Sequence, residues 1–126
     1  MDQFPNLLIV DDTETNLILL KRITLHINVN LIAATSGSEA LMKTRGIDLA
    51  LAILDVRMPE MNGYELAEKL NKERMDGKVP VIFLTANSID ETEMFKGYGS
   101  GAVDYISKPV SSQILLSKIN LDMLVL

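Results

Sequence analysis

Residues 49–63 read LALAILDVRMPEMNG, an unbroken apolar run followed by a polar loop that contains a proline. The apolar part, residues 49–54, is short and shows no alternation of polar and apolar side chains. Such a run is typical of a strand that is buried on both faces, as in a parallel sheet. Four further short apolar runs occur in the chain, at residues 7–10, 31–34, 81–84 and 102–106.

The segments between these runs have the apolar spacing and the capping residues of helices. Ser36 with Glu39, and Ser88 with Glu91, have the spacing of capping boxes. We expect helices over residues 14–25 (capped by Thr13), 37–44 (by Ser36), 63–73 (by Asn62), about 89–97 (by Ser88), and from 111 or 112 to 126. The alternation predicts an α/β fold, a doubly wound, flavodoxin-like (βα)5 sandwich. Its five-stranded parallel sheet is expected in the order 2-1-3-4-5.

The composition excludes several kinds of site. The 126 residues include no Cys and one His, which excludes a disulfide scaffold, thiolate catalysis, Cys-based zinc sites and His-rich metal sites. With 12 basic and 17 acidic residues the formal net charge is −5, which argues against direct nucleic-acid binding. No apolar run approaches the roughly 20 residues that span a bilayer, and no signal peptide is indicated. We expect a single cytoplasmic domain, residues 1–126, without membrane insertion.

Polar residues follow the apolar runs at the points where the expected strands end. Asp11 and Asp12 follow the first run, Asp55 the third, Thr85 the fourth and Lys108 the fifth. In the expected strand order they converge on one edge, with three carboxylates at the topological switch point where open α/β sheets bind ligands. Each residue alone has an ordinary alternative, because an Asp after a strand, such as Asp12, is often a helix cap.

The chemistry of this set points to a cation and a phosphoryl group. Crowded carboxylates repel, so one of them takes up a proton unless a cation intervenes. Oxygen ligands suit hard cations, and Mg²⁺ is usually held by one or two carboxylates with waters and phosphate oxygens. Lys108 adds a positive charge and Thr85 a hydroxyl donor. Together these residues indicate phosphoryl transfer with a carboxylate as the nucleophile.

Four motifs around these residues resemble the signatures of the response-regulator receiver domain of two-component signalling, including its chemotaxis regulators. They are IVDD at residues 9–12, LDVRMPEMNG at 54–63, LTA at 84–86 and DYISKP at 104–109. The resemblance extends from residue 7 to the last expected helix. Four motifs at matching spacing are much more specific than a lone pair of aspartates.

The resemblance implies roles in phosphoryl transfer. Asp55 is similar to the phosphoacceptor, which receives a phosphoryl group from the phosphohistidine of a histidine kinase or a histidine phosphotransfer domain. Asp12 resembles the direct ligand of Mg²⁺ or Mn²⁺, and Asp11 resembles a ligand that acts mainly through water. The carboxylate of Asp55 and the backbone carbonyl of Arg57 are the further metal ligands.

The resemblance also implies a switch. Thr85 is similar to the hydroxyl residue that moves to bind the phosphoryl group, Lys108 to its cationic partner, and Tyr105 to an aromatic residue that then swings inward. The bond between Lys108 and Pro109 is usually cis in the family. The switched surface is expected to comprise the helix after Ser88, residues 102–106 and the last helix. It would control an output domain in the same chain or a partner protein.

Several residues flank the site without reacting. We interpret those in the loop after the acceptor as turn supports. The flanking residues are Met58, Pro59, Asn87 and Pro109, and Gly63 shapes the loop together with Met58 and Pro59. Asn87 and Arg57 each lie two residues beyond a site residue, at positions that vary in the family and influence the lifetime of the phosphoryl group.

The last expected helix is more apolar than one core-facing stripe requires. It ends in Met-Leu-Val-Leu without a capping glycine. Two explanations remain open: the domain is one module of a longer multidomain protein, or the extra apolar face forms a homodimer or binds a partner.

Two other functions are alternatives to a receiver. A haloacid-dehalogenase-like phosphatase also uses Asp, Thr or Ser, Lys and Mg²⁺, but its nucleophile follows the first strand in a DxD pattern. Here Asp11 and Asp12 are adjacent, and the best nucleophile, Asp55, follows the third run. A pseudo-receiver that only binds partners would not need the acidic set with Thr85 and Lys108. We therefore expect a signalling phosphoacceptor with intrinsic self-phosphorylation and dephosphorylation, and not a metabolic enzyme.

Overall fold

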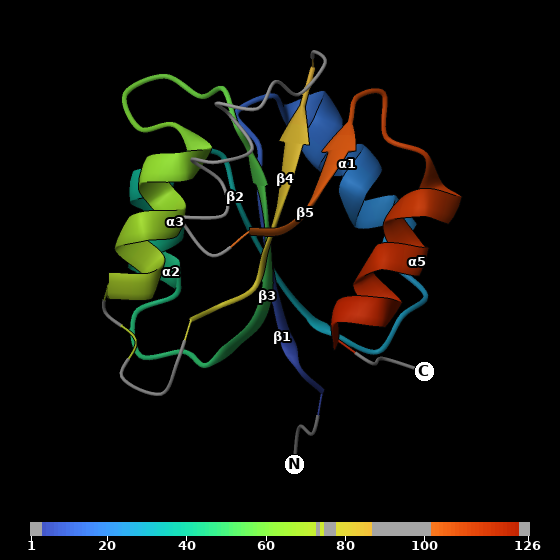
Figure 1. The fold of residues 1–126 in the computed structure, drawn as a ribbon, viewed down its shortest axis with the longest axis horizontal. Helices are drawn as coiled ribbons and strands as arrows, with labels where there is room; N and C mark the ends of the chain where they lie inside the picture. Colours follow the sequence, from blue (N-terminus) through green and yellow to red (C-terminus); the bar gives the residue numbers. More distant parts are fainter. Residues whose placement is uncertain (1–3, 73, 75–77, 87–101, 124–126) are drawn as a thin grey trace.

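The computed structural model describes residues 4–72, 74, 78–86 and 102–123. Strands and helices alternate along most of the chain (Figure 1). The strands are β1 (Asn6–Val10), β2 (Asn30–Ala34), β3 (Leu49–Asp55), β4 (Val81–Thr85) and β5 (Ala102–Ser107). The helices are α1 (Glu14–Ile23), α2 (Gly37–Lys43), α3 (Gly63–Lys72) and α5 (Ser112–Met123).

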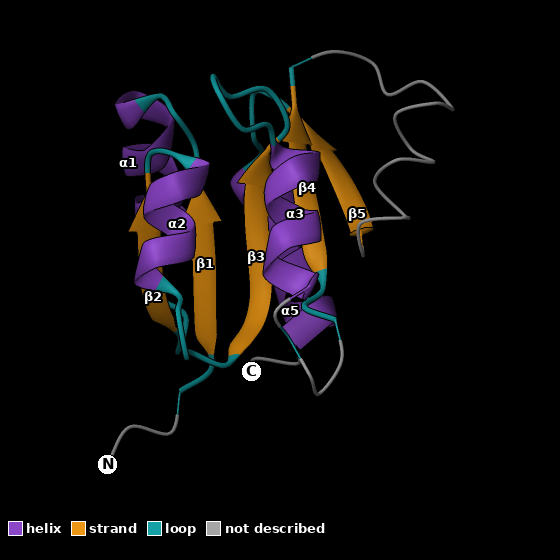
Figure 2. Cartoon of the chain, turned by 90° about the vertical axis from the view of Figure 1, so that its left-hand side faces the viewer, coloured by secondary structure: helices purple, strands orange, loops and turns teal. Residues whose placement is uncertain are grey.

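The five strands form one parallel sheet in the order β2-β1-β3-β4-β5. This confirms the flavodoxin-like, doubly wound α/β fold predicted from the sequence. Helices α2 and α3 cover one face of the sheet, and α1 and α5 cover the other (Figures 1 and 2). Because all strands are parallel, their carboxyl ends meet at one edge, and β1 and β3 lie side by side there.

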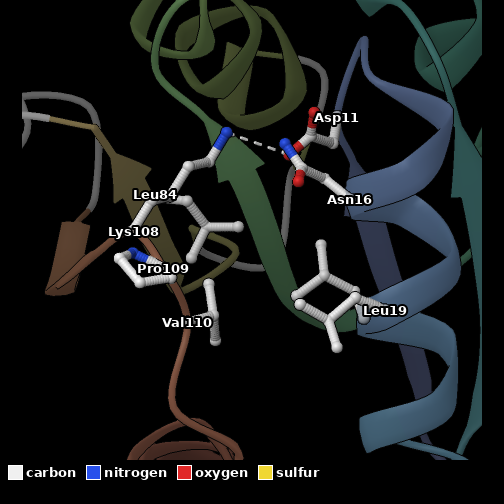
Figure 3. Close-up of a pocket in the computed structure, with 8 residues that line it drawn as sticks. Asp11, Asn16, Leu19, Leu84, Lys108, Pro109 and Val110 are labelled. Carbon is white, nitrogen blue, oxygen red and sulfur yellow. Dashed lines mark ion pairs between the residues drawn. The ribbon is translucent and has the colours of Figure 1, made fainter.

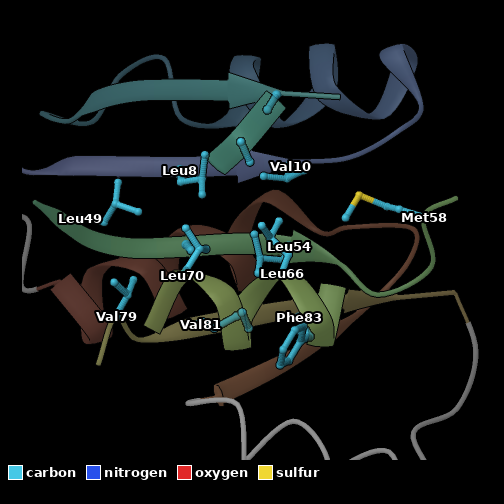
Figure 4. Close-up of a cluster of buried hydrophobic side chains, with 14 of the residues drawn as sticks. Leu8, Val10, Leu49, Leu54, Met58, Leu66, Leu70, Val79, Val81 and Phe83 are labelled. Carbon is cyan, nitrogen blue, oxygen red and sulfur yellow. The ribbon is translucent and has the colours of Figure 1, made fainter. Parts of the chain in front are cut away.

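The apolar runs are continuous because both faces of the sheet are covered by helices. Successive strand side chains point to opposite faces. Leu8 and Val10 of β1 pack in the cluster beneath α2 and α3, whereas Leu7 and Ile9 pack in the cluster beneath α1 and α5. Figure 4 shows the first of these clusters, with Phe83 of β4 at its edge. This two-sided burial fixes the positions of the residues that follow the strands.

Capping hydrogen bonds fix the first residues of the helices, and the sequence predicts some of these bonds but not all of them. Asn62 Oδ1 accepts from the N–H of Glu65 at 2.9 Å, and Glu65 Oε1 accepts from the N–H of Asn62 at 3.0 Å, which is a reciprocal capping box. Ser36 caps α2 as predicted, with its Oγ 3.1 Å from the nitrogen of Glu39. Thr13 occupies the N-cap position of α1 as predicted, but its side chain makes no cap hydrogen bond within the described residues.

Helix α5 confirms the excess of apolar residues. Leu115 and Ile119 are buried, whereas Ile114 and Leu121 are 50% and 75% exposed. The described helix ends at Met123, and residues 124–126 lie outside the description. The expected helix after Ser88 and the flanking residue Asn87 also lie outside it. Among the described helices, none is long and apolar enough to cross a membrane.

Candidate functional site

Three acidic side chains meet at the carboxyl ends of β1 and β3. Val10 of β1 pairs with Leu54 of β3, so the residues that follow them, Asp11 and Asp55, lie on adjacent strands. Asp11 is fully buried, Asp55 is 5% exposed, and Asp12 is exposed. One carboxylate oxygen from each of the three lies within 4.8 Å of the others. The predicted acidic cluster therefore exists in the fold.

Lys108, from the turn after β5, pairs with two of these carboxylates. Its Nζ lies 3.1 Å from Asp11 Oδ2 and 3.2 Å from Asp55 Oδ2. The Lys108 N–H donates a hydrogen bond to the carbonyl of Thr85 at 2.7 Å, which ties this turn to the end of β4. The Lys108–Pro109 peptide bond is cis, as the resemblance implies. Figure 3 shows the Lys108–Asp11 ion pair beside Asn16 of α1.

Both oxygens of the Asp11 carboxylate have partners. Oδ1 accepts a hydrogen bond from the backbone N–H of Thr13 at 2.9 Å, and Oδ2 pairs with Lys108. The N–H of Thr13 belongs to the start of α1, so Asp11 performs part of the capping that was expected of the Thr13 side chain. Asp11 thus links the first helix to the ammonium group of the site.

The charge state of Asp55 is set by opposing effects. Its pKa is raised from 3.8 to about 6, mainly by burial and then by the neighbouring Asp11 carboxylate. The Lys108 ammonium and the backbone N–H of Arg57 oppose this rise, because both stabilise the carboxylate form. Burial also disfavours the charged form of Lys108, but Asp11 and Asp55 outweigh this and raise its pKa. The lysine is therefore charged at neutral pH.

The donor set fits a hard divalent cation. Three carboxylates and one ammonium leave a formal charge of −2 in a largely buried space. All available donors are oxygens, which Mg²⁺ and Mn²⁺ accept and softer metals do not favour. A bound cation would counter the repulsion that raises the pKa of Asp55. The residues present are thus compatible with the metal that the sequence predicts.

The comparison with known protein families decides the assignment. The model of the family described as "Response regulator receiver domain" matches residues 7–120. The chain is a response regulator receiver domain. Receiver domains act in two-component signalling and bind Mg²⁺ at an acidic pocket, which here corresponds to the cluster of Asp11, Asp12 and Asp55.

Relatives and solved structures agree with this assignment. The probable transcriptional regulator ycf29 of Pyropia yezoensis is 40% identical over 110 residues, 85% of this chain and 49% of that protein. A probable cyclic di-GMP phosphodiesterase of Vibrio cholerae is 39% identical over 114 residues, 90% of this chain and 25% of that protein. A CheY-like receiver domain of Methanospirillum hungatei has a TM-score of 0.85 and 30% identity, and covers 96% of this chain and 94% of that one.

These matches can be compared with the two alternative functions, a phosphatase and a pseudo-receiver. The receiver chain spans only a quarter to a half of the two curated relatives, so their own activities do not transfer to it. The family is a signalling family. Neither the haloacid-dehalogenase-like phosphatase nor the pseudo-receiver is favoured by any of these matches.

The expected switch residues of the receiver domain lie on β4 and β5, the two strands that follow β3 in the sheet. Thr85 ends β4 and is buried. Tyr105 of β5 is half-buried, and its ring lies 5.5 Å from that of Phe83. The Phe83 ring lies 4.6 Å from that of Tyr64 in α3, and the hydroxyls of Tyr105 and Tyr64 are 3.4 Å apart. An aromatic chain thus connects β5, β4 and α3.

The start of α3 and the loop before it contain two features that the sequence did not reveal. Tyr64 is 41 residues from Tyr105, and no local pattern marks their contact. Glu60 has a φ of +67°, and around it the N–H of Met61 donates to the carbonyl of Pro59 at 2.7 Å. Such a tight turn at a non-glycine residue is rare and strained. Met58 is buried in the core, which agrees with its interpretation as a support.

Proposed function

We propose that Asp55 of this receiver domain accepts a phosphoryl group from the phosphohistidine of a histidine kinase or a histidine phosphotransfer domain. One observation carries the proposal. The Asp55 carboxylate ends the central strand, 3.2 Å from the Lys108 ammonium and beside two further carboxylates. This arrangement supports Asp55 as the nucleophile, because the Lys108 ammonium beside it can balance the added charge.

In the transfer step one bond to phosphorus forms and one breaks. An oxygen of Asp55 forms a bond to phosphorus while the phosphorus–nitrogen bond of phosphohistidine breaks, and that electron pair returns to the imidazole nitrogen. Lys108, held near Asp55 and Asp11, stabilises the negative charge on the transferred group. Later attack by water releases inorganic phosphate and regenerates the carboxylate, so the intrinsic activity is slow self-phosphorylation and dephosphorylation.

The metal site is assigned to carboxylates at the same edge. Asp11, Asp12 and Asp55, with the backbone carbonyl of Arg57, would hold Mg²⁺ or Mn²⁺, and the bound ion would supply positive charge near the transferred phosphoryl group. Both oxygens of Asp11 already have protein partners, in Thr13 and Lys108. The exposed Asp12 would therefore be the better direct ligand, and Asp11 would act through water.

Phosphorylation is read out by Thr85 and Tyr105. The hydroxyl of Thr85 binds the phosphoryl group, and Tyr105 follows it inward. This is a local electrostatic change that biases a two-state element. The affected surface is that of β5, α5 and the segment before β5. It controls an output domain of the same protein or a partner, with residues 1–126 as one receiver module.

The test is transfer of labelled phosphate, in Mg²⁺, from a phosphorylated histidine kinase or acetyl phosphate. Wild type should incorporate acid-labile phosphate, and Asp55→Asn should not. Asp48→Asn is the matched control, because Asp48 is exposed and lies just before the opposite end of the same strand. Equal labelling of wild type and Asp55→Asn would reject Asp55 as the acceptor.

A further inference from the structure

Gly63, the first residue of α3, packs against the backbone of Asp55. It is buried, and its N–H donates a hydrogen bond to the carbonyl of Val56 at 2.9 Å. A Cβ on Gly63 would lie 2.4 Å from the carbonyl oxygen of Asp55 and 3.0 Å from its carbonyl carbon. It would also lie 3.0 Å from the Cα of Val56. No side chain fits between α3 and this peptide as the two now stand.

The strand side of this contact is held in place. Leu54 pairs with Val10 of β1, Asp55 pairs with Leu84 of β4, and the Val56 N–H donates to the carbonyl of Leu84 at 2.9 Å. The other side consists of α3 and the loop of residues 57–62, which leaves β3 and returns to it at Gly63. A side chain at Gly63 must therefore displace either the Asp55 peptide or the loop.

Either displacement changes the proposed acceptor site. Movement of the peptide shifts the Asp55 carboxylate relative to Lys108. Movement of the loop shifts the backbone carbonyl of Arg57 relative to the same carboxylate. Ordinary carbon–oxygen contacts are about 3.3–3.6 Å, so relief of a 2.4 Å contact requires a shift of roughly 1 Å.

We infer that Gly63 is a positioning residue of the acceptor site: its lack of a side chain lets α3 abut the Asp55 peptide and sets where the Asp55 carboxylate and Arg57 carbonyl lie. The inference rests on the proposed function, because those two groups are assigned there to acceptance and metal binding. A misplacement of about 1 Å can lower a reaction rate about 100-fold. We therefore expect Gly63→Ala to slow phosphoryl acceptance by 10- to 100-fold and to weaken Mg²⁺ binding.

Gly37→Ala is the matched control. Gly37 is also buried and is also the first residue of a helix. There an added Cβ would meet Met61, whose sulfur lies 2.5 Å away. The Met61 Cβ and Cγ would lie 3.1 Å away, so a small shift of this flexible side chain relieves the contact, whereas the contact at Gly63 is with backbone and is relieved only when the Asp55 peptide or the loop moves. The same substitution should therefore leave acceptance and Mg²⁺ binding within twofold of wild type.

Three measurements on the full chain test the inference. They are the Mg²⁺ dissociation constant, the Mg²⁺-induced change in the NMR signal of the Asp55 side-chain carboxyl carbon, and the acetyl phosphate labelling rate per folded molecule. Loss of stability alone would not alter the first two in molecules that remain folded. Values within twofold of wild type for Gly63→Ala would overturn the inference.

Glu60→Gly provides a second background, in case Gly63→Ala folds poorly. It removes the left-handed strain at an exposed residue, so Glu60→Gly/Gly63→Ala can be compared with Glu60→Gly alone. The same weakened Mg²⁺ binding and labelling are expected in the double variant. Failure of both to fold would also overturn the inference, because the contribution of Gly63 would then be to stability. Failure of the proposed function can be told apart from failure of this inference. If Asp55 is not the acceptor, Asp55→Asn will be labelled like wild type, and the Mg²⁺ and NMR comparisons will still report the effect of Gly63→Ala.

Discussion

Asp55→Asn is expected to stabilise the metal-free domain at neutral and alkaline pH. The folded protein disfavours the Asp55 carboxylate, because burial raises its pKa from 3.8 to about 6. The unfolded chain holds the same carboxylate in water without this cost. Below pH 3.8 both states are protonated, between 3.8 and 6 the folded state loses stability as pH rises, and above 6 the full cost is present.

The size of the effect follows from the two pKa values. The difference between 3.8 and about 6 corresponds to about 3 kcal/mol in the free energy of unfolding at pH 8, and to about 1 kcal/mol at pH 4.5. Asn has nearly the same shape and no charge, so it removes this cost. With a urea dependence of about 1–3 kcal/mol per molar, the unfolding midpoint should rise by about 1–3 M at pH 8.

Urea unfolding in EDTA, followed by circular dichroism at pH 8 and pH 4.5, measures this difference. Asp48→Asn removes an equal charge at an exposed position and should leave the midpoint nearly unchanged. Mg²⁺ at pH 8 should stabilise wild type and narrow its gap to Asp55→Asn, because a bound cation offsets the charge. Equal midpoints for wild type and Asp55→Asn at pH 8 would refute the reasoning, as would a gap at pH 4.5 that is as large as the gap at pH 8.

Three further predictions concern neighbouring residues. Glu60→Gly should raise the free energy of unfolding by about 1 kcal/mol in urea titrations, because it removes a left-handed backbone at a non-glycine residue. Lys108→Ala should raise the pKa of Asp55 above about 6 in a carbon-13 NMR titration of metal-free protein, since its ammonium stabilises the carboxylate; an unchanged or lower pKa would contradict this. Arg57→Ala should change the half-life of the acid-labile phosphate, because its cationic side chain follows the acceptor by two residues; an unchanged half-life would reject that role.

The sheet and the convergence of the site were predictable from the sequence. Unbroken apolar runs such as residues 49–54 indicate strands covered on both faces, and alternation with helices requires parallel strands. Once β1 and β3 are neighbours, Asp11 and Asp55 must meet at their carboxyl ends. The position of Lys108 follows from the same edge. These features depend on the spacing of apolar residues and on the order of the strands, and both can be inferred from a single sequence.

Other features depend on how the strands and helices are placed in space and on which of several neighbouring groups forms a given hydrogen bond. The Thr13 side chain was expected to cap α1, but the Asp11 carboxylate takes the Thr13 N–H, a result of where β1 ends. The Tyr64–Tyr105 contact and the close approach of Gly63 to Asp55 arise only when α3 packs on the sheet. The raised pKa of Asp55 likewise reflects burial, Asp11 and Lys108 acting together.

The central claim is that Asp55 carries the phosphoryl group, and chemical mapping tests it most directly. Receiver phosphorylated with acetyl phosphate in Mg²⁺ can be reduced with borohydride, which converts an aspartyl phosphate into homoserine. Peptide mass spectrometry then identifies the reduced residue. We predict homoserine at position 55, in amounts that match the incorporated phosphate and depend on Mg²⁺. Homoserine at Asp11 or Asp12, or phosphate incorporation without homoserine at position 55, would contradict the claim.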